Sequence, residues 1–415
     1  MEFYENIEKP EKAVLVGLDT GAYDCETSLA ELEALAYTAG AEVEAKLSQK
    51  REKPDTATCL GSGRLAELKT FCEENEISLL IFDLELSPSQ QRNTERETGV
   101  RVIDRTTLIL DIFAARARSG EGKLQVELAQ LRYSLPRLGG QGTSLSRLGG
   151  GIGTRGPGET KLETDRRHIR RRISALEREL ESLEKRRGLA RARRAKDGVE
   201  TVAIVGYTNA GKSTLMNQLT QAGVLVEDKL FATLDPTARA LTLPDGRKVM
   251  LVDTVGFLRR LPHGLVEAFQ STLEEAVSAS VLLNVCDASD PDCAEHLEVT
   301  NDLLRELGCE GIPVLCVMNK CDLAENLLEL PTLAGTVMIS ALENQGLDKL
   351  LEAVAKALPP TRRRVSLQIP YRDGAAAARL RQEGAVFSED FREDGLHMDV
   401  IADARLLEEF QDYIL

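Results

Sequence analysis

A glycine-rich stretch between an apolar segment and a helix carries the clearest chemistry in the sequence. Residues 201–205 predict a strand that runs directly into Gly206-Tyr-Thr-Asn-Ala-Gly-Lys-Ser213. In this G-x-x-x-x-G-K-S pattern, the P-loop, backbone N–H groups converge on phosphate oxygens and the helix N-terminus adds partial positive charge. Lys212 is expected to reach the β- and γ-phosphates, and the Ser213 hydroxyl is expected to bind Mg²⁺. The stretch therefore predicts a nucleoside triphosphate site.

A second motif selects the base of the nucleotide. A predicted strand at 313–318 ends in Asn319-Lys-Cys-Asp322, and a later strand at 336–339 ends in Ser340-Ala-Leu342. The Asp322 carboxylate accepts two hydrogen bonds that guanine donates and adenine does not, and such contacts discriminate by about 10⁴-fold. The lysine is expected to lie along the base, the asparagine to tie this loop to the P-loop, and the alanine N–H to meet guanine O6. The expected nucleotide is GTP.

Two further segments are expected to respond to the γ-phosphate. One strand ends in Asp253-Thr-Val-Gly256, whose aspartate holds a water of the Mg²⁺ ion and whose glycine N–H touches the γ-phosphate. The other segment is Phe231-Ala-Thr-Leu-Asp235, where Thr233 is the second hydroxyl ligand of the metal unless Thr237 takes that place. Such switch segments are ordered by the γ-phosphate and Mg²⁺ and are released on hydrolysis.

The usual water-positioning glutamine is missing. Small regulatory GTPases place a glutamine directly after the Asp-x-x-Gly motif to orient the attacking water, whereas this chain has Phe257 there. Intrinsic hydrolysis is therefore expected to be slow unless another group is supplied. Asn209, the fourth P-loop residue, either binds a monovalent cation such as K⁺ where an arginine finger would act, or only shapes the loop.

Together these motifs predict one site that binds GTP and Mg²⁺ and hydrolyses GTP to GDP and phosphate. The predicted catalytic residues are Lys212, Thr233, Gly256 and Asn209. The predicted metal ligands are Ser213, Thr233 and, through a water, Asp253. The predicted nucleotide-binding residues are Gly206, Tyr207, Thr208, Asn209, Ala210, Gly211, Lys212, Ser213, Phe231, Ala232, Thr233, Leu234, Asp235, Asp253, Thr254, Val255, Gly256, Asn319, Lys320, Cys321, Asp322, Ser340, Ala341 and Leu342.

Alternating strands and helices are expected to hold these motifs in place. Residues 198–360 alternate in this way and predict an α/β P-loop GTPase domain. Residues 1–119 predict an N-terminal α/β domain with a parallel sheet, with strands at 14–16, 79–82 and 100–103 and helices at 28–39, 64–75, 87–98 and 106–118. Residues 361–415 read strand, helix, strand, strand, helix. This pattern predicts a small α+β C-terminal module with a Glu389-Asp390…Gly395 turn between its last two strands.

Residues 120–197 predict an antiparallel helical hairpin. Two leucine-rich seams follow heptad spacing, at Leu124, Leu128, Leu131, Leu135 and Leu138 and at Leu162, Ile169, Ile173, Leu176, Leu180 and Leu183. Pro136 is expected to help end the first helix, and the second, about 159–194, would be ~50 Å long. The segment 139–158 holds nine glycines and is expected at the tip. A disordered linker is the alternative that glycine content alone favours.

The hairpin region is basic within an acidic chain. Residues 137–197 hold 17 Lys or Arg against 8 Asp or Glu, whereas the net charge of the whole 415-residue chain is −15. Such a segment is expected to attract the phosphates of RNA, and a merely solvated helix face is the alternative.

Cysteine usage and hydropathy exclude other classes. The eight cysteines contain no C-x-x-C pair, which argues against a zinc ribbon and indicates reduced thiols in a cytoplasmic protein. No apolar run approaches the ~18 residues needed to cross a bilayer, and the first residues lack the apolar core of a signal peptide. Neither integral membrane association nor DNA binding is expected.

Four segments form a recognisable set: 104–114 (DRTTLILDIFA), 125–131 (QVELAQL), 149–160 (GGGIGTRGPGET), and the P-loop with 231–235 (FATLD). With them the whole chain resembles the HflX family of ribosome-associated GTPases. The resemblance implies binding to the large ribosomal subunit, a hairpin that reaches toward the peptidyl-transferase region, and splitting or rescue of stalled ribosomes under stress. It also implies ATP hydrolysis, although the N-terminal domain contains no G-x-x-x-x-G-K and no ATP site is assigned there.

Three functions therefore compete. The leading one is a GTPase, monomeric when free, whose hairpin engages ribosomal RNA with Arg147 and Arg155 on phosphates. The second is a GTPase that assists RNA modification, folding or ribosome assembly off the translating ribosome. The third is an interaction protein that binds no RNA and dimerises through the hairpin seams.

Overall fold

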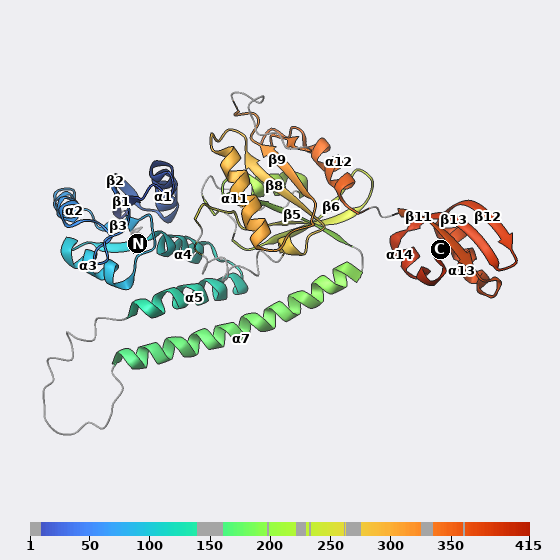
Figure 1. Ribbon diagram of the computed structural model, residues 1–415, viewed down its shortest axis with the longest axis horizontal. Coiled ribbons are helices and arrows are strands. Elements are labelled where there is room, and N and C mark those ends of the chain that lie inside the picture. Colours follow the sequence, from blue (N-terminus) through green and yellow to red (C-terminus); the bar gives the residue numbers. More distant parts are fainter. Residues whose placement is uncertain are drawn as a thin grey trace, which may run out of the picture.

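The described part of the chain contains three β-sheets, each with its own helices, and a separate pair of helices that lie side by side (Figure 1). The computed structural model describes residues 10–138, 161–196, 199–220, 230–231, 234–260, 262, 275–324, 335–359 and 362–415. The predicted glycine-rich tip at 139–158, with Arg147 and Arg155, lies outside these residues, as do Ala232 and Thr233. The predicted α/β fold with flanking domains is confirmed, and the domain boundaries at 119, 197 and 360 stay predictions.

The N-terminal sheet is parallel, as predicted, with strand order β2-β1-β3-β4. Its strands are β1 Lys12–Asp19, β2 Glu42–Lys50, β3 Leu79–Phe82 and β4 Arg101–Asp104, and its helices are α1 Cys25–Ala39, α2 Ser62–Glu74, α3 Pro88–Thr98 and α4 Arg105–Arg116. Strand β2 was not predicted. It is a polar edge strand whose residues alternate between exposed and half-buried, so it lacks the apolar run that marks the inner strands.

The predicted helical hairpin is present. Helix α5 spans Gly120–Ser134 and continues into the 3₁₀ turn η1 Leu135–Leu138, while α7 spans Lys161–Lys196. The two helices lie side by side in Figure 1. The ion pairs Arg187–Glu121 (3.0 Å) and Arg132–Glu177 (2.7 Å) show that the helices run antiparallel, and Arg172 also pairs with Glu127 (2.6 Å). The seam residues Leu128 and Leu176 are buried between them.

A six-stranded sheet carries the predicted nucleotide motifs, with strand order β10-β9-β8-β5-β7-β6. Its strands are β5 Glu200–Gly206, β6 Thr237–Thr242, β7 Lys248–Asp253, β8 Val281–Asp287, β9 Val314–Asn319 and β10 Val337–Met338, and its described helices are α8 Lys212–Thr220, α11 Cys293–Glu306 and α12 Leu347–Ala357. Only β6 pairs antiparallel among these strands. The motifs follow the carboxyl ends of β5, β7 and β9, so the parallel sheet gathers them at one edge.

The C-terminal module has the predicted order of elements, but its turn was misplaced. It contains β11 Arg362–Ile369, η3 Tyr371–Asp373, α13 Gly374–Glu383, β12 Ala385–Arg392, β13 Gly395–Asp403, α14 Ala404–Glu408 and η4 Gln411–Tyr413. Glu389 and Asp390 lie inside β12, and the turn falls at 393–394. A bidentate ion pair from Arg381 of α13 to Glu389 (2.7 and 2.8 Å) explains why an acidic residue is accommodated in the strand.

Candidate active site

The P-loop connects β5 to α8, and Lys212 lies buried inside its curve. The Lys212 ammonium donates to the backbone oxygens of Gly206 (3.1 Å) and Tyr207 (2.7 Å). Burial lowers the pKa of Lys212 to about 8, and the nearby Asp253 carboxylate opposes this shift. The lysine is therefore held within the loop by neutral carbonyl groups, in a position where phosphate oxygens would stabilise its charge.

The predicted Mg²⁺ ligands meet between two neighbouring strands. The Ser213 hydroxyl donates to Asp253 Oδ2 at 2.8 Å, because Asp253 ends β7 beside β5. A hydroxyl and a carboxylate are oxygen ligands of the kind that Mg²⁺ prefers, so the residues present fit this ion. Thr237 lies opposite Asp253 in the β6–β7 ladder. Thr233 is outside the described residues. The structure therefore does not decide which of the two threonines is the second hydroxyl ligand of Mg²⁺.

Gly256 is packed tightly against the P-loop. A Cβ atom at Gly256 would lie 2.8 Å from Thr208 Cα and 2.9 Å from Lys212 Nζ. Only a glycine fits this approach, which brings the backbone of the Asp253–Gly256 segment to the loop expected to hold the phosphates. The neighbouring Thr254 is also buried and donates its hydroxyl to Ile204 O of β5 at 2.7 Å.

Asn319 ties the base-recognition loop to the P-loop, as predicted. Its Nδ2 donates to Ala210 O at 2.9 Å, and its Oδ1 accepts from Ala341 N at 2.9 Å. The Ala341 N–H, which we expected to meet guanine O6, therefore has a side-chain acceptor in this structure. Lys320 pairs with Asp287 at the end of β8 (2.7 Å), and Asp322 is exposed.

Replacing Gly211 with alanine is expected to abolish nucleotide binding, measured as loss of fluorescent GDP binding. Gly211 has φ +88°, and a Cβ there would lie 2.3 Å from Asn319 Nδ2. The methyl group would strain the loop and push away the asparagine that joins the phosphate and base loops. Gly246→Ala is the control, because Gly246 has a similar φ of +84° but nothing within 4 Å of its Cβ. If Gly211→Ala kept its affinity for GDP, the proposed importance of the contact between Asn319 and the P-loop would be contradicted.

Phe257 is a packing residue of the core and not a polar group of the site. Its side chain is 1% exposed, and it belongs to the cluster that also contains Phe231 and Tyr207. Its backbone N–H donates to Gly206 O at 3.0 Å, and its carbonyl accepts from Thr208 N at 2.8 Å. The residue at the glutamine position therefore braces the P-loop through its backbone and cannot orient water.

The P-loop tyrosine fastens the nucleotide site to the N-terminal domain. The Tyr207 hydroxyl bonds to the Glu31 carboxylate of α1 and accepts from Arg259 N at 2.8 Å. Its ring stacks on His296 of α11, with centroids 3.7 Å apart and planes 14° apart. Burial and the Glu31 carboxylate raise the pKa of Tyr207, so it stays a neutral hydrogen-bonding group.

A buried ion network extends this contact. Asp83, fully buried at the end of β3, accepts from Arg105 Nη1 (2.9 Å) and from Arg260 Nη1 (3.0 Å). Arg105 also pairs with Glu31 and donates to Arg259 O at 3.1 Å. Arg259 and Arg260 follow the Asp253–Gly256 segment in sequence, separated from it by two residues. The N-terminal domain thus holds the chain at both the P-loop and this switch, and removing one partner of such a buried pair typically costs about 3–5 kcal/mol.

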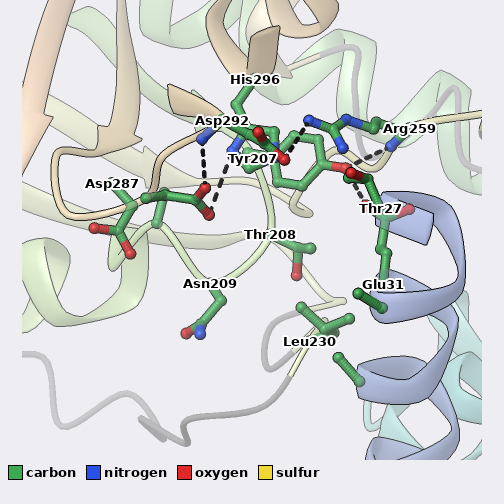
Figure 2. A pocket seen from close by; sticks show the side chains of 14 residues that line it. Thr27, Glu31, Tyr207, Thr208, Asn209, Leu230, Arg259, Asp287, Asp292 and His296 are labelled. Atoms are coloured by element: carbon green, nitrogen blue, oxygen red, sulfur yellow. Dashed lines mark hydrogen bonds and ion pairs between the residues drawn. The ribbon is translucent and has the colours of Figure 1, made fainter. Parts of the chain in front are cut away.

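A cleft of about 230 Å³ opens between α1 and the P-loop. Figure 2 shows Thr27 and Glu31 on one side and Thr208 and Asn209 on the other. Asn209 has φ +61°, a left-handed conformation that asparagine tolerates, and its side chain lines the cleft. The structure fits both roles predicted for Asn209, shaping the loop and offering an oxygen to a cation.

The structure also shows residues around the site that sequence reasoning missed. No recognised motif contains Glu31, Asp83, Arg260 or His296, and Arg105 lies in the 104–114 segment without an assigned role; their partners lie up to 232 residues away in sequence. Two signals were available: the charged pair Asp104-Arg105 beside an apolar helix, and the pair Arg259-Arg260 two residues after a predicted switch.

Comparison with known proteins decides the family. Residues 26–114 match the model described as GTP-binding GTPase N-terminal, 116–194 match the GTP-binding GTPase Middle Region, and 201–320 match the 50S ribosome-binding GTPase. GTPase HflX of Caldanaerobacter subterraneus subsp. tengcongensis is 52% identical over 407 residues, which cover 98% of this chain and 94% of that protein. The chain belongs to the GTPase HflX family.

Other relatives extend the match. GTPase HflX of Alkalihalophilus pseudofirmus is 49% identical over 391 residues, covering 92% of this chain and 91% of that protein. GTPase HflX of Escherichia coli is 44% identical over 398 residues, covering 94% and 93%. As an HflX-family protein the chain is a P-loop GTPase that hydrolyses GTP, so the predicted family and enzyme class are confirmed. Within the described residues, no helix is long and apolar enough to span a membrane.

Proposed function

We propose that this HflX-family GTPase binds the large ribosomal subunit through its helical hairpin and N-terminal domain, and splits or rescues stalled ribosomes under stress. The observation that carries the proposal is the match of residues 201–320 to the family of 50S ribosome-binding GTPases. A cytoplasmic location, where ribosomes work, and a monomeric free state belong to the same proposal.

The exposed face of α7 supports an RNA partner. Arg170 and Arg171 are exposed on this helix, whereas Arg172 makes a bidentate ion pair with Glu127 of α5 (both bonds 2.6 Å). Of these three arginines, one thus helps to hold the hairpin together and two are presented to solvent. Phosphate contacts by arginine supply affinity without reading sequence, as binding to structured ribosomal RNA requires.

In the proposed site, Ser213, Thr233 and, through water, Asp253 would hold Mg²⁺, which would neutralise charge on the phosphates. Lys212 and the Gly256 N–H stabilise charge that develops on the γ-phosphate. The remaining role, orienting water or supplying a further positive group, falls to a K⁺ ion at Asn209 or to groups of the ribosome, because Phe257 cannot perform it.

Sedimentation of ribosomes with the full-length protein tests the proposed function. With a non-hydrolysable GTP analogue the protein is expected to travel with the large subunit, and with GTP it is expected to shift 70S ribosomes into subunits. Binding to free ribosomal RNA or assembly intermediates without binding to mature subunits would instead favour the role off the translating ribosome. Self-association without any RNA or ribosome binding would favour the dimerising alternative.

Neutralising Arg170 and Arg171 together is expected to reduce the slope of log affinity for the large subunit against log salt by up to about 2 units. The slope counts phosphate contacts, and each exposed arginine supplies at most one. Arg172→Ala is the matched control, because Glu127 already occupies that guanidinium and the slope should hardly change. GDP binding by the free protein should be unaffected in both variants. An unchanged slope in the double variant would mean that this face is only solvated.

A further inference from the structure

Residues 231–235 form one of the two predicted switch segments. Its two described ends, Phe231 and Asp235, both contact the N-terminal half of the protein. At one end, Phe231 is buried and its ring meets that of Phe113 of α4 edge to face, with centroids 4.7 Å apart. The Phe231 N–H donates to the Thr208 hydroxyl of the P-loop at 2.8 Å. Phe231 has φ +55°, an unfavourable conformation for a bulky residue. Tertiary contacts, and not local preference, therefore set the conformation of Phe231.

At the other end, Asp235 binds the start of the hairpin. Its Oδ2 accepts from the backbone N–H groups of Arg118 (2.9 Å) and Ser119 (2.8 Å), and its Oδ1 accepts from the Ser119 hydroxyl. Ser119 is the N-cap of α5, and its hydroxyl oxygen accepts from Gly122 N at 2.8 Å. A carboxylate is favourable there because the helix N-terminus presents unpaired N–H groups and positive partial charge.

The helix is shaped to receive this carboxylate. A Cβ atom at Gly122 would lie 2.3 Å from Asp235 Oδ1 and 3.3 Å from Asp235 Cγ, so any larger residue would displace the carboxylate. At Gly120, two residues earlier in the same helical turn, a Cβ would meet nothing within 4 Å. The glycine at 122 thus makes room for Asp235, although glycine is a poor helix former.

We propose that Asp235 is a positioning residue for GTP hydrolysis, which fixes the 231–235 segment against α5 and so links the nucleotide site to the hairpin through one carboxylate. The inference rests on the proposed role of 231–235 as a switch. With Asp235 in place, the Phe231–Thr208 contact holds the segment beside the P-loop. Movement of the segment withdraws Asp235 from the first turn of α5, and movement of α5 pulls on the segment.

Steady-state GTP hydrolysis by full-length variants tests this role. Asp235→Ala is expected to lower kcat by about 5-fold or more, the lower end of typical coupling between sites. KM and the affinity for GDP should stay within about 2-fold, because the Asp235 carboxylate, which we predicted to be part of the nucleotide site, instead accepts from Arg118 and Ser119. Asp235→Asn should restore most of the rate, since its amide oxygen can still accept from the two backbone N–H groups.

Gly122→Ala gives the same test from the opposite side of the contact. The added methyl group is expected to reproduce the loss of kcat, whereas Gly120→Ala, with an equal gain in helix propensity, should keep the wild-type rate. In the Asp235→Ala background, Gly122→Ala should cause no further loss, because the group that it would displace is gone. Full activity in Gly122→Ala, additive losses in the double variant, or a raised kcat in Asp235→Ala would each overturn the proposal.

Hydrogen exchange separates this inference from the proposed switch. In the wild type, exchange at residues 230–235 and at amides 118, 119 and 122 should both differ between GDP and a non-hydrolysable GTP analogue. In Asp235→Ala the difference at the α5 amides should disappear while that at 230–235 persists. A response at 230–235 without one at α5 in the wild type overturns the link alone. No response at 230–235 overturns both the link and the switch.

Discussion

Asp322→Asn is expected to change the preferred nucleotide from GTP to XTP. The asparagine amide donates where the carboxylate accepted, so it faces two guanine donors without a bond but matches a xanthine oxygen. Sites built on such hydrogen bonds typically discriminate by on the order of 10⁴-fold, and a reversal of preference of that order is the expected result. Competition between GTP and XTP for a fluorescent GDP analogue measures it.

The structure supplies both the reason for this prediction and its control. Asn319, three residues before Asp322, is held by Ala210 O and Ala341 N, so the carboxylate is carried on a fixed loop. The intervening Cys321 directs its thiol to Met318 O at 3.3 Å, away from the expected base, and Cys321→Ser should keep the preference for GTP. A variant at Asp322 that still prefers GTP over XTP would show that the base contact is assigned wrongly.

Hydrolysis is expected to depend on groups outside the side chains of the GTPase domain. Large ribosomal subunits or K⁺ should raise the turnover number at least about 10-fold, since an added arginine finger gives about 10³–10⁵-fold in other GTPases. If the cation is the source, hydrolysis will be faster in K⁺ than in Na⁺ at equal ionic strength, and Asn209→Ala will remove that difference. If the ribosome is the source, subunits will stimulate hydrolysis in either salt.

Phe257→Gln is the sharper test of the same prediction. We expect no gain in intrinsic rate, because the side chain at this position is buried in the core and would not reach the attacking water. The buried amide would lack partners, at a cost of about 1–3 kcal/mol in stability beyond the lost packing, visible as a lower melting temperature. A large rise in intrinsic rate would show instead that a conventional site lacked only its glutamine.

Much of the chemistry was readable because each motif is a short, continuous run. In 206–213 and 319–322 the spacing along the chain fixes the spacing in space, since each run follows a strand and turns at its end. The rule that parallel strands end at one edge then brings separate runs together without knowledge of side-chain packing. The heptad seams predicted the α5–α7 hairpin because the spacing of apolar residues along a helix identifies its apolar face. This information is also local to the sequence.

The errors have equally physical causes. Strand β2 is polar on an edge, so its burial pattern is too weak to reveal it, and the turn after β12 was misplaced because acidic residues in a strand resemble a turn until their arginine partner is known. Both depend on neighbours that a local pattern does not contain.

The sequence by itself determined the nucleotide, the class of reaction and the family. Only the tertiary structure decided how the parts are joined: Tyr207 to Glu31, 176 residues apart, Arg260 to Ser28, 232 apart, and Asp235 to Arg118, 117 apart. Which charged and polar side chains become partners depends on which lie close together in the folded state. The periodicity of the sequence does not contain that information. The link between the nucleotide site and the hairpin is of this kind, because a carboxylate and a helix N-terminus become partners only once two sheets have folded beside each other.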